Sequence, residues 1–283
     1  MPSKANRLLF AAAGCAVALV ALLVAAYSVG PVERADATAL DGLRSVSEEN
    51  RWLWHIGDAF AHSVDLPFLV LGVVLIAFAG LRLGRRRQAV AAVSLIVAAN
   101  VLTQAIKMAA AHPRYQAVLE PHQLSTEAFP SGHATAALSL ALAAVLVAPG
   151  HRRPVVAAIG GGFALAVSVS LMLQGWHFPS DVLGAVMVVG MVSCLVAAAL
   201  VASGAEPAEQ KGLGRAWLRS AGAIAAEVAL LGLAGIAVVV VVTHPGAVGS
   251  YVADHTSAVV AAIGVALASL GLVSGLATEL ETS

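Results

Sequence analysis

Charged, aromatic and sulfur-containing side chains are scarce in this sequence. Of its 283 residues, 11% are charged, 5% are aromatic and two are cysteines. Lysine plus arginine and aspartate plus glutamate each number 16, and no basic run with interleaved aromatics occurs, so we expect no nucleic-acid partner. Cys15 and Cys194 lie inside apolar runs, which favours packing over a disulfide framework or a thiolate metal site.

Apolar residues make up 59% of the chain, well above the share in an ordinary soluble domain. Runs of about 18 to 25 mostly apolar residues can cross the hydrocarbon core of a bilayer. We therefore predict an all-α, polytopic membrane helix bundle, whose first helix is retained because it lacks a convincing cleavage site. The predicted spans are 8–30, 66–83, 89–110, 132–149, 154–173, 181–202, 221–243 and 256–276.

Two polar segments divide the chain. Residues 204–220, rich in glycine, are predicted to be a cytoplasmic linker. This linker separates a six-helix domain, residues 1–203, from two additional transmembrane helices and a short tail, residues 221–283. Segment 31–64 is too polar to span and has apolar residues at helical spacing, which predicts an outer amphipathic helix that lies on the membrane or caps the bundle.

The cations are distributed unevenly over the loops that these spans define. Eleven of the 16 fall on one side, namely Lys4, Arg7, Arg82, Arg85, Arg86, Arg87, Arg152, Arg153, Lys211, Arg215 and Arg219. The other five, which are Arg34, Arg44, Arg51, Lys107 and Arg114, fall on the opposite side. Because cytoplasmic loops carry the excess of cations, we expect the N-terminus to be cytoplasmic. The composition favours a bacterial inner membrane.

Two short motifs open apparent helices on the predicted outer face. They are FPSGH, residues 129–133, and HFPSD, residues 177–181. Proline suits a first helical turn, and the free N–H groups after it can bind an anion. Ser131 adds a hydroxyl, and Gly132 allows a ligand to approach the backbone closely. The simpler interpretation of PSGH is a capped turn.

Ionisable residues cluster around the same helix ends. Lys107 and Arg114 share a helix face if the helix persists past Pro113; each alone is explained by snorkelling to the headgroups. His177 and Asp181 are four residues apart, so the carboxylate can orient the imidazole and strengthen it as a nucleophile, while His133 serves as general acid. Capping by Asp181 explains that residue equally well.

These blocks resemble the signature of the type 2 phosphatidic acid phosphatase family of membrane lipid phosphate phosphatases. The blocks are Lys107 with Arg114, the PSGH stretch at 130–133, and Ser170 with His177 and Asp181. The resemblance covers roughly residues 66–203. It implies six core helices, an extracytoplasmic active site and metal-independent hydrolysis through a phosphohistidine.

The resemblance also implies a role for each matching residue. His177 would be the nucleophile, Asp181 its orienting partner and His133 the general acid. The implied phosphate ligands are Lys107, Arg114, Ser131 and Gly132. No metal site and no cofactor are expected.

The chain departs from the family pattern at two positions. Tyr115 stands where the family usually has proline, and Leu171 stands where it has an arginine. Loss of one charge-assisted hydrogen bond to phosphate, about 1.5 to 3 kcal/mol, predicts a rate lowered by about 10- to 100-fold. Arg51 or His122 on the same side is a candidate substitute.

The leading hypothesis is a hydrolase that acts on a lipid phosphomonoester or diphosphate. A prenyl diphosphate is the favoured substrate, followed by phosphatidic acid or phosphatidylglycerophosphate. The alternative is a weakened or inactive lipid-phosphate-binding protein marked by Leu171. A transporter is disfavoured because the key groups lie at helix ends rather than at mid-depth. Expected partners are membrane lipids, with the C-terminal helix pair as a possible surface for a homo-oligomer or a membrane partner.

Overall fold

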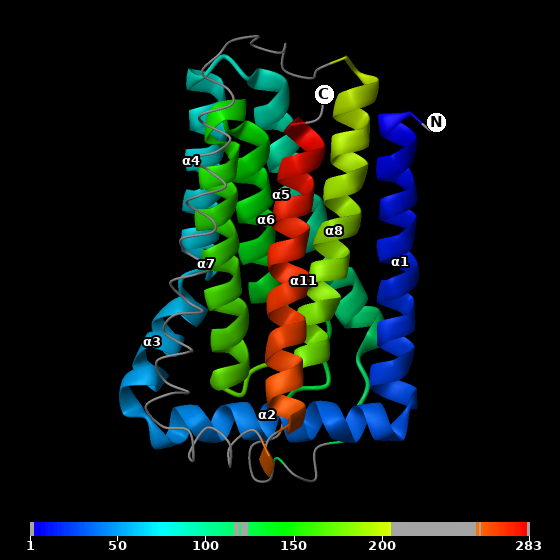
Figure 1. Ribbon diagram of the computed structural model, residues 1–283, viewed down its shortest axis with the longest axis vertical. Helices are drawn as coiled ribbons and strands as arrows, with labels where there is room; N and C mark the ends of the chain where they lie inside the picture. The colour runs from blue at the N-terminus through cyan, green and yellow to red at the C-terminus, as the bar shows by residue number, and fades with distance from the viewer. Residues whose placement is uncertain (1–2, 116–118, 120–123, 205–252, 255, 282–283) are drawn as a thin grey trace.

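A computed structural model describes residues 3–115, 119, 124–204, 253–254 and 256–281 of the chain. These residues form an all-helical bundle (Figure 1). The first helix, α1 (Lys4–Ser28), starts at Ser3, whose hydroxyl accepts from the Asn6 N–H at 3.2 Å. Val29 then caps both α1 and the next helix, and Pro31 opens that helix, so the chain turns without a loop.

The second helix, α2 (Gly30–Glu49), lies across one end of the bundle (Figure 1). It buries Leu40 and Leu43 on one face and exposes polar residues on the other. The α3 helix (Arg51–His62) comes next and meets α4 (Leu66–Arg82) at a bend of 58°. The predicted outer segment 31–64 is therefore two helices, and the first of them caps the bundle against α11, α7 and α1.

The remaining described helices run up and down the bundle. They are α5 (Arg86–Ala110), α6 (Gly132–Val147), α7 (Arg153–Leu173), α8 (Pro179–Ala202) and α11 (Thr256–Glu281), with a 3-10 turn η2 (Gly150–Arg152) before α7. The α11 helix packs on α7, α8 and α2, so this predicted C-terminal helix is part of the bundle. The predicted span 221–243 and residues 205–220 of the predicted linker lie outside the described residues.

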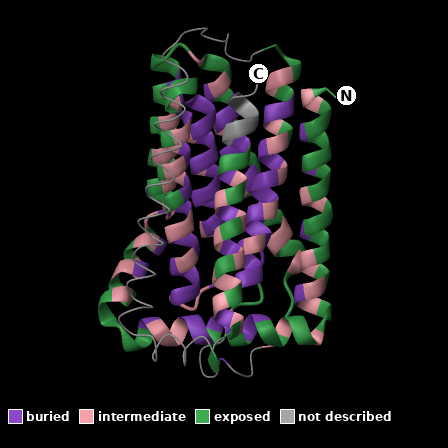
Figure 2. Ribbon diagram, in the orientation of Figure 1, coloured by how far each residue is buried: buried purple, intermediate pink, exposed green. Residues whose placement is uncertain are grey.

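The core is centred on α6, which is enclosed by α5, α7 and α8 and forms the most continuously buried stretch (Figure 2). Small residues bring these helices close together. A Cβ added at Gly160 of α7 would lie 3.2 Å from the Cα of Ala141 on α6. Close backbone approach at small residues is the usual way in which membrane helices associate.

Seven of the eight predicted spans coincide with described helices, but not all of them are long enough to cross a membrane alone. Five helices, α1, α5, α7 together with η2, α8 and α11, meet the length and hydropathy expected of a span. The α4 helix has 17 residues and completes a span only with the bent α3, and α6 has 16. The protein is a multi-pass membrane protein.

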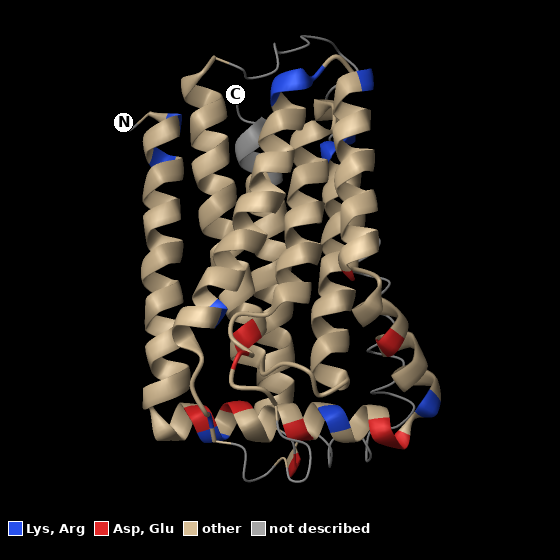
Figure 3. Ribbon diagram, turned by 180° about the vertical axis from the view of Figure 1, so that it is seen from behind, with Lys and Arg blue, Asp and Glu red and all other residues tan. Residues whose placement is uncertain are grey.

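Among the described side chains, one end of the bundle carries cations alone, whereas the other carries the acidic residues together with further cations (Figure 3). The alternating helix directions bring Lys4, Arg7 and the arginines around the α4–α5 and α6–α7 turns to one end. The opposite end holds α2 and the starts of α6 and α8. The cation pattern used to predict the loops is therefore consistent with the direction of every described helix.

Candidate functional site

His177 and Asp181 meet because α8 begins at Pro179. Asp181 thereby occupies the first turn, and its Oδ2 accepts from the Phe178 backbone N–H at 2.9 Å. The same oxygen lies 3.4 Å from Nδ1 of His177. Asp181 is 0% exposed and His177 8%. One carboxylate thus makes the contacts that both the helix-capping and the orienting interpretations of Asp181 require.

FPSGH is joined directly to this helix start. The backbone N–H of Ser131 donates to the backbone oxygen of Asp181 at 2.9 Å. The hydroxyl of Ser131 caps α6 by accepting from the Ala134 N–H at 3.3 Å. Phe129 fills the space over Gly184 of α8, where an added Cβ would lie 2.6 Å from the ring. The two predicted helix starts therefore form one unit.

Lys107 approaches this unit from α5. Its Cε lies 4.0 Å from the position that a Cβ would take at Gly132, so the absence of a side chain there leaves room beside the ammonium group. Lys107 is half-buried near the end of its helix. The structure thus brings Lys107, Ser131 and Gly132 together, as the predicted phosphate site requires.

Arg114 lies beyond the end of the Lys107 helix. The α5 helix ends at Ala110, before Pro113, so Lys107 and Arg114 do not share a helix face. The Arg114 guanidinium lies 4.1 Å above the ring of Phe178, and its NH1 donates to Oδ1 of Asp181 at 2.9 Å. Only 3% of this side chain is exposed. Its charge is held against the partner of His177.

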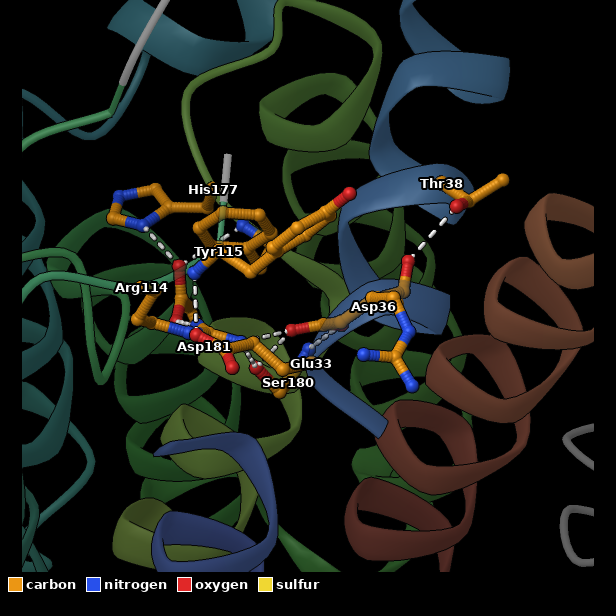
Figure 4. Close-up of polar contacts among 10 residues, drawn as sticks. Glu33, Asp36, Thr38, Arg114, Tyr115, His177, Ser180 and Asp181 are labelled. Atoms are coloured by element: carbon orange, nitrogen blue, oxygen red, sulfur yellow. Dashed lines mark hydrogen bonds and ion pairs between the residues drawn. The ribbon is translucent and has the colours of Figure 1, made fainter. Parts of the chain in front are cut away.

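Asp36 of α2 holds the other side of Arg114 (Figure 4). Its Oδ2 accepts from NH2 of Arg114 and from the Ser180 hydroxyl, the latter at 2.6 Å, while its Oδ1 accepts from the Ser180 N–H at 3.1 Å. The pKa of the Asp36 carboxyl is raised, because burial and the nearby Asp181 carboxylate outweigh the opposing effects of Arg114 and Ser180. A chain of contacts therefore runs from Asp36 through Arg114 and Asp181 to His177.

His133 has a carboxylate of its own. Nε2 of His133 lies 3.2 Å from Oδ1 of Asp65, which sits at the bend between α3 and α4. Both side chains are partly exposed, at 32% and 41%. The ring of Trp176, next to His177, lies 5.7 Å from the His133 ring. His133 is thus held at the same end of the bundle as His177.

Leu171 and Tyr115 have structural roles in this chain. Leu171 is 0% exposed and belongs to the hydrophobic core, and the Tyr115 backbone N–H donates to the Glu33 carboxylate of α2. Of the candidate substitute cations, Arg51 is exposed at the start of α3, and His122 lies outside the described residues.

Asp36 and Asp65 were missed by the sequence interpretation, although one of them left a signal. Asp36 stands four residues before Leu40 and seven before Leu43, so it falls on the apolar face of its amphipathic helix. A carboxylate in that register indicates a buried partner. Asp65 gives no such signal because its contact depends on the α3–α4 bend.

Known proteins match this chain in two ways. The family model described as PAP2 superfamily matches residues 88–204. Among solved structures, the chain is similar to a crystal structure described as the first transmembrane PAP2 type phosphatidylglycerolphosphate phosphatase from Bacillus subtilis. That match has a TM-score of 0.55 and 21% sequence identity, and covers 72% of this chain and 100% of that one. No curated protein matches the chain.

Proposed function

Because residues 88–204 match the family model described as PAP2 superfamily, we propose that this membrane protein hydrolyses a lipid phosphomonoester or diphosphate through a phosphohistidine. The observation that carries the proposal is the contact between His177 and Asp181, made beside the start of α6 and Lys107. A buried carboxylate on Nδ1 leaves Nε2 of the same ring as the nucleophile.

The first chemical step forms a bond between Nε2 of His177 and the phosphorus atom. The bond from phosphorus to the leaving oxygen breaks, and His133 gives its proton to that oxygen. Lys107, the Ser131 hydroxyl and the N–H groups of Gly132 and His133 at the start of α6 bind the non-bridging oxygens, where negative charge accumulates. Water then attacks the phosphohistidine, and His133, now neutral, accepts a proton from that water.

Arg114 acts in this proposal chiefly through Asp181. Three of its five N–H donors are used within the cluster, because NH1 donates to Asp181 and NH2 to Asp36 and Ser180. The buried Nε–H has no partner among the described residues, so it is the donor through which Arg114 would keep its predicted place as a phosphate ligand. Lys107, Ser131 and Gly132 therefore make up the primary phosphate site. This division of roles is supported by the burial of Arg114 and by the partial exposure of Lys107.

A prenyl diphosphate remains the favoured substrate, with phosphatidic acid and phosphatidylglycerophosphate next. The similar crystal structure is named as a phosphatidylglycerophosphate phosphatase, which supports including that lipid in a substrate panel. We place the active site on the extracytoplasmic face of a bacterial inner membrane, since the arginine-rich end of the bundle should face the cytoplasm.

Phosphate release by the purified protein in detergent tests the proposal. Farnesyl diphosphate, phosphatidic acid and phosphatidylglycerophosphate would each be supplied with and without a chelator. We expect release from at least one lipid in chelator and a loss of at least about 1,000-fold in His177→Ala, because the nucleophile is removed. His151→Ala, an exposed histidine at the opposite end of the bundle, is the matched control. Full activity in His177→Ala would overturn the mechanism.

A second candidate function is lipid-phosphate binding without turnover. It is favoured by one observation, the burial of Leu171 in the core where the family has an arginine. It predicts saturable binding of the same lipids with no phosphate release from any of them. The panel above separates the two functions when binding is measured alongside release.

A further inference from the structure

The buried cluster behind His177 carries an unbalanced charge. It contains two carboxylates, Asp36 and Asp181, and one guanidinium, Arg114, all with less than 10% of the side chain exposed. The Ser180 hydroxyl and the Ser180 and Phe178 backbone N–H groups add polar contacts, and Nδ1 of His177 lies against Asp181. Both carboxylates have hydrogen-bond partners, and with both ionised the formal charge sums to −1.

Asp36 supplies the extra negative charge, and it does so from outside the matched segment 88–204. Without it, Arg114 and Asp181 would form a neutral pair, and Asp181 would have little net charge with which to support the ring of His177. With it, the guanidinium is shared between two carboxylates. Direct Coulomb interactions of this kind are strong where side chains are shielded from water.

This charge has opposite consequences for the two states of the reaction. A phosphate that arrives at the start of α6 is anionic, so the net negative cluster weakens its binding. Once His177 is phosphorylated at Nε2 and still protonated at Nδ1, its ring is cationic, and the same cluster stabilises it. An interaction that disfavours the bound substrate and favours the phosphohistidine raises turnover at the expense of affinity.

We propose that Asp36 is a positioning residue that acts through Arg114 and Asp181 to promote phosphoryl transfer to His177 while lowering the affinity of the site for phosphate. The expected effect on phosphoryl transfer rests on the proposed function. The expected effect on phosphate affinity concerns anion binding alone. It also makes α2 a working part of the catalytic unit rather than a cover at the end of the bundle.

Asp36→Asn tests the proposal because it removes the charge and keeps one of the two oxygens that accept from Ser180 and Arg114. Binding of inorganic phosphate would be measured by calorimetry and turnover on farnesyl diphosphate by phosphate release. We expect phosphate to bind about tenfold more tightly, kcat to fall by about 10- to 100-fold, and KM to fall with it. Asp41→Asn, an exposed carboxylate on the same helix, should change none of these values.

Two further variants separate charge from packing. Ser180→Ala keeps both carboxylates and removes one contact of Asp36, so its phosphate affinity should stay within about twofold of the parent protein. Asp36→Ser provides a second neutral side chain at this position. A cooperative thermal transition in detergent identifies the neutral variant that is folded, and the phosphate affinity of that variant decides the result. Unchanged or weaker phosphate binding in that variant, or a tenfold gain in Ser180→Ala, overturns the proposal.

The outcomes also distinguish this proposal from the proposed function. If the parent protein releases phosphate from no lipid but Asp36→Asn binds inorganic phosphate more tightly, the charge competition stands and the phosphatase assignment fails. If the parent protein is an active phosphatase and Asp36→Asn neither gains phosphate affinity nor loses kcat, the assignment stands and the role of Asp36 is refuted.

Discussion

The two histidines at the α6 and α8 helix starts are each paired with a carboxylate, but in contrasting surroundings. Asp181 is 0% exposed, and its two oxygens are held by Arg114, the Phe178 N–H and His177. Asp65 is 41% exposed, and its side chain contacts His133. A rigid, buried carboxylate fixes one ring orientation, whereas an exposed one allows exchange of protons with water.

This difference matches the two proposed roles. A nucleophile needs one tautomer and one direction of attack, which the buried pair provides. A general acid must lose and regain its proton in every cycle, which the exposed pair allows. The contrast explains why two pairs with the same residue types can serve different steps.

The largest effect is expected from removing the charge of the buried pair. Asp181→Asn should lower the rate of phosphate release by about 1,000- to 10,000-fold, because the amide no longer fixes the tautomer of His177 or stabilises its cationic form. The thermal transition should also fall, since Asp181 is a partner of the buried Arg114. Retention of more than a tenth of the activity would show that the buried carboxylate is only a helix cap.

A smaller effect is expected from the exposed pair. Asp65→Asn should lower the rate by about 3- to 10-fold, because His133 keeps its place and water can replace the carboxylate as a proton acceptor. Asp58→Asn is the control, since Asp58 pairs with His62 at 3.3 Å instead. A loss as large as that of Asp181→Asn would remove the contrast between the two pairs.

The smallest effect concerns the ring of Trp176, which contacts His133. Trp176→Phe should change the rate by less than about threefold, since a smaller ring keeps most of the contact with His133. Steady-state kinetics on the best lipid of the panel would measure this. A larger loss confined to kcat would mean that Trp176 sets the distance between the two histidines.

The sequence was sufficient to predict the parts of this molecule that depend on local chemistry. Apolar runs located the helices, and a proline at position 179 fixed the start of α8, so that the contact between His177 and Asp181 could be expected from their spacing. The proximity of Lys107 to Gly132 was also predicted, through the family resemblance.

The features that could not be predicted depend on contacts between distant segments. Arg114 would share the face of Lys107 only if the helix persisted past Pro113, but α5 ends at Ala110 and the guanidinium turns toward α2 and α8. Asp65 meets His133 only because α3 and α4 bend at that point. The spacing of residues along the chain predicts neither the α3–α4 bend nor the crossing of α2 over the end of the bundle.

The shortness of α6 has a consequence for substrate selection. Sixteen residues at about 1.5 Å each give about 24 Å, less than the bilayer hydrocarbon thickness of about 30 Å. At its far end α6 leads through Pro149 to Arg152 and Arg153, so the shortfall belongs to the Ser131 end. With Arg152 at the headgroups of the far leaflet, a phosphate group bound at the Ser131 end would lie below the headgroup plane. Partition into the membrane would then select lipids over water-soluble esters before any side chain recognises them.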